Sequence, residues 1–434
     1  MSKKNLTHKH PPEMILLATV EICQRFALWG IANLLVLYLL QGHGMGADKA
    51  ERIFGIFTGA AFVLPLVGGY ISDHWDYHKS VFLGCILTAL GCFLIALNTF
   101  SLLYLALVCV AIGGCLFTPS IYTLLGNVYH DRHHLREAGF SIYYAAVNIG
   151  VFLALIIMGV LGNAGNWSFA FALAGIVQLV GLIPLTIAFR RPALQNAYKG
   201  SRFHLHMGSG HQPLSSREKR RILVICTLAI FSILFWLSYN QGGSSLTLFA
   251  LHYTDRHVGS FVIPPSWMLS MESLYLIILA VPLASFYVWL AKRKLDPSPP
   301  MKVAYSLVAM GICFLIMVLG SSSIPDGAQS GHISPFYLVF AYLFMAVGEM
   351  LLCPIGLALV THLSPPRFTA FLVGVWYVCI GIAFYLGGEI ATFMASITHL
   401  SDFFWIFVVA TIIPAVILML IARKLNHMRH LESL

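Results

Sequence analysis

The chain has 434 residues, of which 59% are hydrophobic and only 10% are charged, and its formal net charge is +9. Soluble globular domains carry about 25% charged residues, so this composition excludes an ordinary soluble protein, and it equally excludes a disordered or collagen-like chain. The nine cysteines lie in apolar runs and form no CxxC pair, so we expect neither a metal site nor a disulfide framework.

Long apolar runs recur along the chain, separated by short polar breaks. A membrane-spanning helix needs about 20 apolar residues, whereas the strands of a membrane barrel alternate over about 10 residues. We therefore predict twelve transmembrane helices, near residues 13–40, 50–73, 79–98, 101–129, 138–162, 167–189, 219–253, 263–293, 300–319, 335–363, 368–396 and 402–423. The polar N-terminal stretch lacks a cleavage site, so the first helix is expected to stay in the mature protein.

The Lys and Arg residues gather on one side of these predicted helices. If the N-terminus is cytoplasmic, Lys49, Arg52 and Arg256 lie on the opposite side and Arg25 lies within the first helix, which leaves 22 of the 26 basic residues in cytoplasmic segments. Basic residues collect in cytoplasmic loops, so both termini are expected inside. The positive charge then reports topology and attraction to anionic lipid, and we expect no nucleic-acid partner.

The longest polar stretch divides the chain into two halves of six helices. We expect an N-terminal six-helix bundle over 1–189, a basic cytoplasmic linker over 190–218 and a C-terminal six-helix bundle over 219–434. Two such halves are typical of the major-facilitator architecture, which holds its substrate near the bilayer midplane. The predicted fold class is an all-α membrane protein with this fold, expected to be a monomer and multi-pass in the bacterial inner membrane.

Ionisable residues within the spans are the strongest functional signal, because each is costly unless it is paired or hydrated. Glu21 and Arg25 are four residues apart and share a helical face, so they can form either a structural pair or part of a proton relay. Glu349 lies near the middle of its span and Glu272 about a third of the way along its span, and both are expected to be functional. Glu389 is at a span end and can reach interfacial water.

Three uncharged side chains in the spans, Asn148, Gln241 and Trp376, are also candidates for ligand contact. The alternative is that the two amides join helices and that the tryptophan belongs to the core.

The second predicted span ends in GGYISDHW. Gly68 and Gly69 allow close helix packing there, and Asp73 can cap the helix or pair with the neighbouring half. The pattern G-G-x-x-x-D is similar to a signature of the loops between major-facilitator helices.

Five blocks of the sequence, in order, resemble the proton-dependent oligopeptide transporter family. They are EICQRFALWG in the first span, GGYISDHW in the second, LFTPSIYTLLGNVYHDRHHLREAGFSIYYAAVNIGVF in the fourth and fifth, LFWLSYNQGGSSLTLFA in the seventh, and GEMLLCPIGLALVTHLSPPRFTAFLVGVW in the tenth and eleventh. Because they cover nearly the whole length, the resemblance implies the family's fold with twelve helices; the 29-residue linker is too short for the two extra helices of many bacterial members.

The chain departs from the family pattern at four motif positions. Gln24 replaces the second Glu of the first-span motif, Ala32 replaces an Arg, Thr118 replaces a Lys, and Glu272 stands where the family has an Asn. These changes remove two cations from the side that faces a peptide carboxylate and add a carboxylate to the side that faces its amino group. We therefore regard the chain as a divergent member whose ligand is expected to be cationic or amine-rich.

The resemblance implies roles for particular residues. Those expected to bind substrate are Trp29, Asn148, Gln241, Glu272, Glu349 and Trp376. Those expected to couple protons are Glu21, Arg25 and Glu349, and those expected to pack or gate the helices are Gly68, Gly69 and Asp73.

The function that follows is secondary active transport, with proton-coupled uptake of a peptide-like or amine-bearing small solute by alternating access. Two alternatives stay open: an exporter or exchanger of a non-peptide solute that uses no protons, and a transport-inactive ligand sensor. The sequence has no nucleotide-binding loop and no metal cluster, so we expect no enzyme and no cofactor, with the proton gradient as the energy source.

Overall fold

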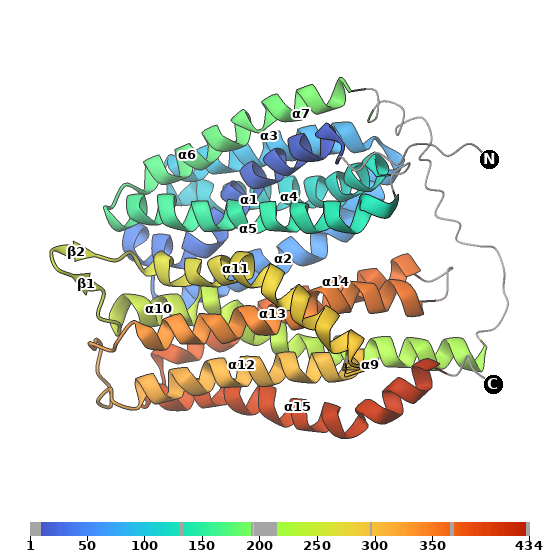
Figure 1. Cartoon of the computed structure of the whole chain (residues 1–434). Helices are drawn as coiled ribbons and strands as arrows, with labels where there is room; N and C mark the ends of the chain where they lie inside the picture. The colour runs from blue at the N-terminus through green and yellow to red at the C-terminus, as the bar shows by residue number, and fades with distance from the viewer. Residues whose placement is uncertain are drawn as a thin grey trace. The chain divides into compact units, whose positions relative to one another are not determined.

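The computed structural model describes residues 10–129, 133–191, 194, 215–295, 297–364 and 369–430. These residues are almost entirely helical (Figure 1). The α-helices are α1 (Pro12–Leu37), α2 (Ala47–His74), α3 (Tyr77–Ala96), α4 (Phe100–Val128), α5 (His133–Asn163), α6 (Trp167–Val180), α7 (Leu182–Phe189), α9 (Ser216–Tyr239), α10 (Ser245–His252), α11 (Pro265–Lys292), α12 (Pro299–Ser321), α13 (Phe336–Leu363), α14 (Thr369–Ala391) and α15 (Leu400–His430). Shorter elements are a π-helical turn η1 (Tyr38–Gly42), 3-10 turns η2 (Asn240–Gly243) and η4 (Thr392–Ala395), and strands β1 (His257–Val258) and β2 (Phe261–Val262).

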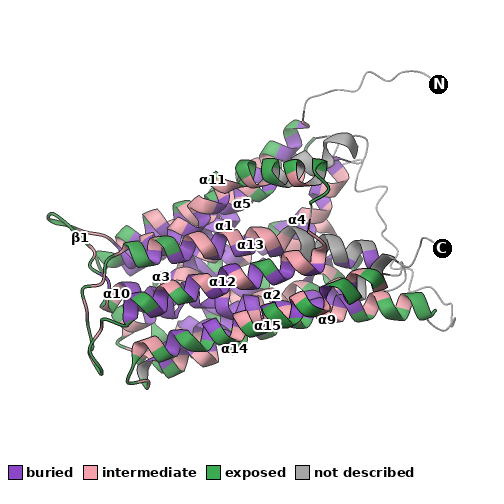
Figure 2. Cartoon of the chain, turned by 60° about the horizontal axis from the view of Figure 1, so that its bottom comes forward, coloured by how far each residue is buried: buried purple, intermediate pink, exposed green. Residues whose placement is uncertain are grey.

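Among the described residues, twelve helical stretches are long and apolar enough to cross a membrane, which confirms the predicted number. Their outward faces are apolar as well. On α15, Val409, Ile413, Val416 and Leu420 follow helical spacing and are all exposed, and Figure 2 shows the green, exposed stripe along this helix. A stripe of this kind suits contact with lipid chains, because water would disfavour so large an apolar face. The side of the membrane on which the termini lie stays a prediction.

Polar side chains cap the N-terminal ends of two helices, α3 and α9. Asp76 precedes α3, and its carboxylate accepts hydrogen bonds from the backbone amides of His78 at 2.7 Å and Lys79 at 3.3 Å. Ser215 precedes α9, where its hydroxyl and the Glu218 carboxylate form a reciprocal capping box. These caps satisfy backbone N–H groups that have no partner inside the helix.

The chain divides into two compact units. The described residues of Met1–Ile31, Leu64–Leu161 and Asn166–His204 form unit 1, and those of Ala32–Val63, Gly162–Gly165 and Leu205–Leu434 form unit 2. The end of α1 and the first half of α2 therefore pack with helices from the second half of the sequence. The predicted boundaries at 189 and 219 follow chain order and stay a prediction; most of the predicted linker lies outside the described residues.

The core of unit 1 lies where α1, α4 and α5 meet α3 and α7. Phe117, Tyr129 and Tyr143 are its largest fully buried side chains, and Val81 and Leu185 pack against the same cluster. In unit 2, aromatic rings join α12 to α15: the Phe314 and Phe407 rings stack with their centroids 4.7 Å apart. Interleaved rings of this size remove a large apolar area from water or lipid and fix the contact geometry.

The seventh predicted span is interrupted. Its helix stops at Tyr239, turns through η2 and resumes as α10, because the Gly242–Gly243 pair lets the backbone change course. Broken helices lie near the substrate sites of many secondary transporters, since irregular backbone is tolerated in a membrane only where protein or a cavity surrounds it.

Three connections join at one end of unit 2, and we call them the unit 2 rim. Strands β1 and β2 form a hairpin between α10 and α11 (Figure 1). The Asp255 amide donates to the Ile333 carbonyl at 2.8 Å, and the Gly327 amide donates to the Thr398 carbonyl at 3.2 Å. Hydrogen bonds from the backbone amide and side chain of His257 hold the pKa of Asp255 below its ordinary value.

Candidate functional site

Two carboxyl groups meet inside unit 2. Glu272 on α11 and Glu349 on α13 are both buried, and their carboxyl groups are close enough to interact electrostatically. Two like charges in a buried site disfavour double ionisation, so the pair favours a state in which one of the two groups holds a proton. The pair therefore presents one acid and one carboxylate, which can attract a cation and can also release a proton. The sequence assigned both residues to one ammonium pocket, and the structure brings them together.

Polar side chains orient the pair. The Tyr239 hydroxyl at the end of α9 donates to Glu272 Oε1 at 3.1 Å, and the Ser273 hydroxyl lies 3.4 Å from Glu272 Oε2. The Cys353 thiol lies 3.9 Å from Glu349 Oε1, one turn along the same helix. The Tyr239 ring packs between Phe235 and Trp236. This aromatic wall limits water around the carboxyl groups, which strengthens their interaction with a bound charge.

A second ionic group lies in unit 1, on the first helix. Arg25 Nε donates to Glu21 Oε1 at 2.5 Å, and the Tyr143 hydroxyl of α5 donates to Glu21 Oε2 at 2.5 Å. Glu21 is fully buried, and Arg25 is 8% exposed. The spacing of four residues explains the first contact, whereas the tyrosine is 122 positions away and could not be found from the sequence. Glu21 thus has a cation and a hydroxyl as partners. Both a carboxylate that exchanges a proton and a carboxylate that only joins two helices would have such partners.

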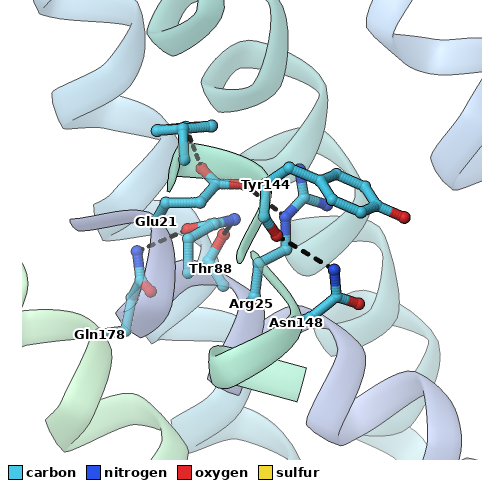
Figure 3. A network of polar contacts seen from close by, with 8 residues as sticks. Glu21, Arg25, Thr88, Tyr144, Asn148 and Gln178 are labelled. Carbon is cyan, nitrogen blue, oxygen red and sulfur yellow. Dashed lines mark hydrogen bonds and ion pairs between the residues drawn. The ribbon is translucent and has the colours of Figure 1, made fainter. Parts of the chain in front are cut away.

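An amide chain runs beside this ion pair (Figure 3). The Gln178 side chain donates to Gln24 Oε1 at 2.6 Å, and the Gln24 side chain donates to the Thr88 hydroxyl at 3.2 Å. The chain links α6, α1 and α3. Gln24, the residue that departs from the family motif, thus joins neighbouring helices through both ends of its amide, and a neutral amide carries no exchangeable charge.

Asn148 lies on α5 in unit 1, and its side-chain amide donates to the Tyr144 carbonyl at 3.0 Å (Figure 3). It is 6% exposed. The residues predicted to share its pocket, Glu272 and Glu349, belong to unit 2. The structure therefore brings together two members of the predicted trio within one unit.

Gln241 lies in the break η2 and is fully buried. Its side-chain amide donates to the Gly387 carbonyl of α14 at 2.9 Å, and the Ser245 hydroxyl donates to its carbonyl oxygen. Asn240 bonds the Phe384 carbonyl in the same way at 2.9 Å. These contacts favour the helix-joining alternative for Gln241.

The two remaining predicted contact residues are tryptophans on two helices. Trp29 is half-buried on α1, and Trp376 is buried on α14. Ala32 and Thr118, where the family has cations, lie on α1 and α4, and Ala32 is buried. Small or uncharged groups therefore occupy both positions.

Gly68 is required by close packing, as its position suggested. A Cβ on this residue would collide with the Cys115 carbonyl of α4, whereas a Cβ on Gly69 would make an ordinary contact with Pro119 at 3.6 Å. Asp73 lies within α2, but its side chain is outside what the structure describes.

Glu51 is a buried acid that the sequence pattern did not single out. This residue lies one turn into α2, beside exposed charges, and resembled a solvent-facing end of a span. Its side chain is fully buried, and both carboxylate oxygens lack a hydrogen bond of ordinary geometry with the described residues. The signal available was its spacing: Glu51, Gly55 and Gly59 lie four apart and share one helical face.

Apolar helices that enclose ionisable side chains in their interior are the construction of a secondary transporter. Comparison with known proteins agrees. The family model described as the POT family matches residues 78–191 and 193–406. The chain belongs to this family, which is a family of transporters rather than of enzymes.

Its relatives are bacterial peptide permeases. The chain is 29% identical to peptide transporter YePEPT of Yersinia enterocolitica subsp. palearctica over 85% of each chain, and 24% identical to dipeptide and tripeptide permease B of Salmonella typhimurium over 91% of this chain and 89% of that one. A crystal structure of a POT peptide transporter variant with alafosfalin shares the fold, with a TM-score of 0.87 at 23% identity over 98% of this chain and 97% of that one. The protein is a multi-pass membrane protein homologous to these permeases.

Proposed function

We propose that this protein takes up peptide-like or amine-bearing small solutes by alternating access and couples uptake to protons. The observation that carries the proposal is the buried Glu272–Glu349 pair. A carboxyl pair that shares one proton binds an ammonium group through its carboxylate, and the shared proton makes binding sensitive to pH. Relatives named as peptide transporters or permeases support the substrate class.

Glu21 and Arg25 are the second part of the proposed machinery. Protonation of Glu21 would weaken its hold on both Arg25 and Tyr143, so one proton would loosen the contact between α1 and α5. Movement of one helix against another is what alternating access needs. Because Gln24 replaces the second Glu of the first-span motif, Glu21 is the carboxylate of that motif that can exchange a proton.

Further residues are proposed to contact ligand within each unit, Trp29 and Asn148 in unit 1 and Trp376 in unit 2. Gly68, Gly69 and Asp73 are proposed to pack or gate the helices. A cationic or amine-rich ligand is favoured by the carboxylate at Glu272 together with the uncharged residues Ala32 and Thr118. We also propose the bacterial inner membrane as the location and division of the chain into halves at 190–218.

The test is accumulation in sealed proteoliposomes. A labelled dipeptide is offered with and without an inward proton gradient, at matched membrane potential. Proton-coupled uptake predicts that the dipeptide accumulates above its external concentration only when the gradient is present. The Glu349→Gln variant should not accumulate the dipeptide. Exchange without gradient-driven accumulation would favour the exchanger, and binding without entry would favour the sensor. The matched control is Asp402→Asn, which removes an exposed carboxylate of the same unit.

A further inference from the structure

Glu51 is a buried acid that the proposed machinery does not use. It lies on α2 in unit 2, with a side-chain exposure of 0%. Neither carboxylate oxygen has a hydrogen bond of ordinary geometry with the described residues, and the Ser244 side chain is the polar group that interacts with it. Ser244 ends the break η2, so the acid faces the discontinuity of the seventh span.

The backbones of two helices meet at this acid, and we call their contact the α2–α14 seam. A Cβ on Gly55 would lie 2.8 Å from the Gly388 Cα, and a Cβ on Gly59 would lie 2.9 Å from the Gly381 carbonyl oxygen. A Cβ on Gly388 would lie 2.9 Å from the carbonyl oxygen of Glu51 itself. The two helices approach closely on the face that carries Glu51, and the Glu51 side chain has no exposure to solvent.

The cation next to Glu51 in the sequence, Arg52, is already paired with another carboxylate. On α2, Arg52 Nε lies 3.1 Å from Glu389 Oε1 of α14, at the exposed edge of the seam. Asp48 and Lys49 precede it on α2 and are exposed. The η2–α10 face presents Ser244, a neutral hydroxyl. A charge on Glu51 would therefore be enclosed, and no residue that the structure describes supplies a cation to balance it.

An enclosed, unbalanced carboxylate is strongly disfavoured, whereas its neutral acid form is tolerated. The seam excludes the water that would hydrate the charge. Separation of α2 from α14 would admit water and reverse this preference. Because α2 belongs by sequence to the first six helices and α14 to the last six, such separation is a movement of one half against the other.

We propose that Glu51 is a proton-binding residue of the transport cycle: it holds a proton while the α2–α14 seam is closed and releases it when the seam opens. Protonation of Glu51 then favours the closed α2–α14 seam. This inference rests on the proposed proton coupling, but its test below needs no ligand and no uptake, so the two can fail separately.

The sign of the pH effect follows from the release of one proton on opening. Raising the pH favours the open seam, and the ratio of open to closed molecules changes by up to tenfold per pH unit. Glu51→Gln keeps the size of the side chain but cannot ionise. It therefore resembles the neutral acid, which is the closed form, at every pH.

The experiment measures the seam directly. A ketone-bearing amino acid is placed at positions 48 and 393, which are exposed and lie beyond the Arg52–Glu389 pair on the two sides of the seam. Each is labelled with a spin label, which leaves all nine cysteines intact. Distances between the labels are recorded by pulsed EPR in nanodiscs from pH 5 to pH 8.5. We expect the open population to rise with pH in the parent protein and to stay low and constant in Glu51→Gln.

Two variants separate proton release from simple damage. Glu389→Gln breaks the exposed ion pair and should change the open fraction while the pH slope persists. Glu51→Asp keeps an acid in the seam and should retain the slope if Glu51→Gln folds poorly. The proposal is overturned if Glu51→Gln keeps the parent's slope, or if the parent's seam shows one distance at every pH. If the parent protein binds no dipeptide, the proposed function is refuted, whereas the EPR result on the seam is unaffected.

Discussion

Replacement of Glu272 by Asn tests whether the carboxyl pair recognises ligand charge. Asn is one methylene shorter than Glu, and it carries a neutral amide that can donate a hydrogen bond to Glu349 in place of the shared proton. The variant therefore keeps one carboxylate for a single ammonium group and loses the capacity for a second negative charge. We expect binding of a ligand with one amine to change little, and binding of a ligand with two amines to weaken.

The size of the effect follows from the geometry. Two unit charges about 4 Å apart interact by about 4 kcal/mol at an effective dielectric of about 20. Desolvation of the ligand's second amine and loss of the proton shared with Glu349 oppose this gain. A net preference of about 1–2 kcal/mol remains, which corresponds to roughly five- to thirtyfold in affinity.

The assay is competition binding at fixed pH with alanyl-lysine and alanyl-norleucine, which differ by one amine. In the parent protein we expect alanyl-lysine to bind more tightly, and its affinity to rise with pH because the second amine displaces the shared proton. In Glu272→Asn, both the preference and its pH dependence should disappear. Equal loss of affinity for the two dipeptides would show that Glu272 does not recognise the charge of the ligand, and it would favour a helix-joining role for this residue.

Three further predictions concern the carboxylates and the topology. Glu349→Gln should weaken binding of amine-bearing ligands at least tenfold, about 1.4 kcal/mol, by isothermal titration; unchanged binding would rule out the ammonium role. Glu21→Gln should abolish accumulation driven by a pH gradient while counterflow exchange and folded yield persist, measured in proteoliposomes and by size exclusion; loss of yield together with exchange would make the Glu21–Arg25 pair structural. A reporter fused at residue 206, outside the described residues, should be active only in the cytoplasm; activity on the other side would contradict the predicted orientation.

The twelve spans could be predicted from sequence because the bilayer imposes one simple requirement, about 20 consecutive apolar residues. Hydropathy does not report how a helix is interrupted. The seventh span reads as one run, but it breaks at η2 because of two adjacent glycines and two interhelical amide bonds. That outcome depends on α14, which is far away in the chain.

The candidate site was predictable in part. The spacing of four residues indicated the contact between Glu21 and Arg25, and family resemblance grouped Glu272 with Glu349. Tyr143 was not predictable as a partner of Glu21, because the contact joins α1 to α5 and no local pattern encodes it. Glu51 was missed because charges at the end of a span normally face water. What buries this residue is backbone contact with Gly388 on another helix.

The unit 2 rim has a consequence for reagents that bind this protein. Backbone hydrogen bonds hold residues 253–255, 327–333 and 398 together, although they come from three separate connections. An antibody selected against the folded protein would recognise a composite epitope that no single peptide reproduces. Such an antibody should lose its target on denaturation and should serve as a probe of correct folding, and by clamping three helix connections at once it would stiffen the helices that carry Glu272 and Glu349.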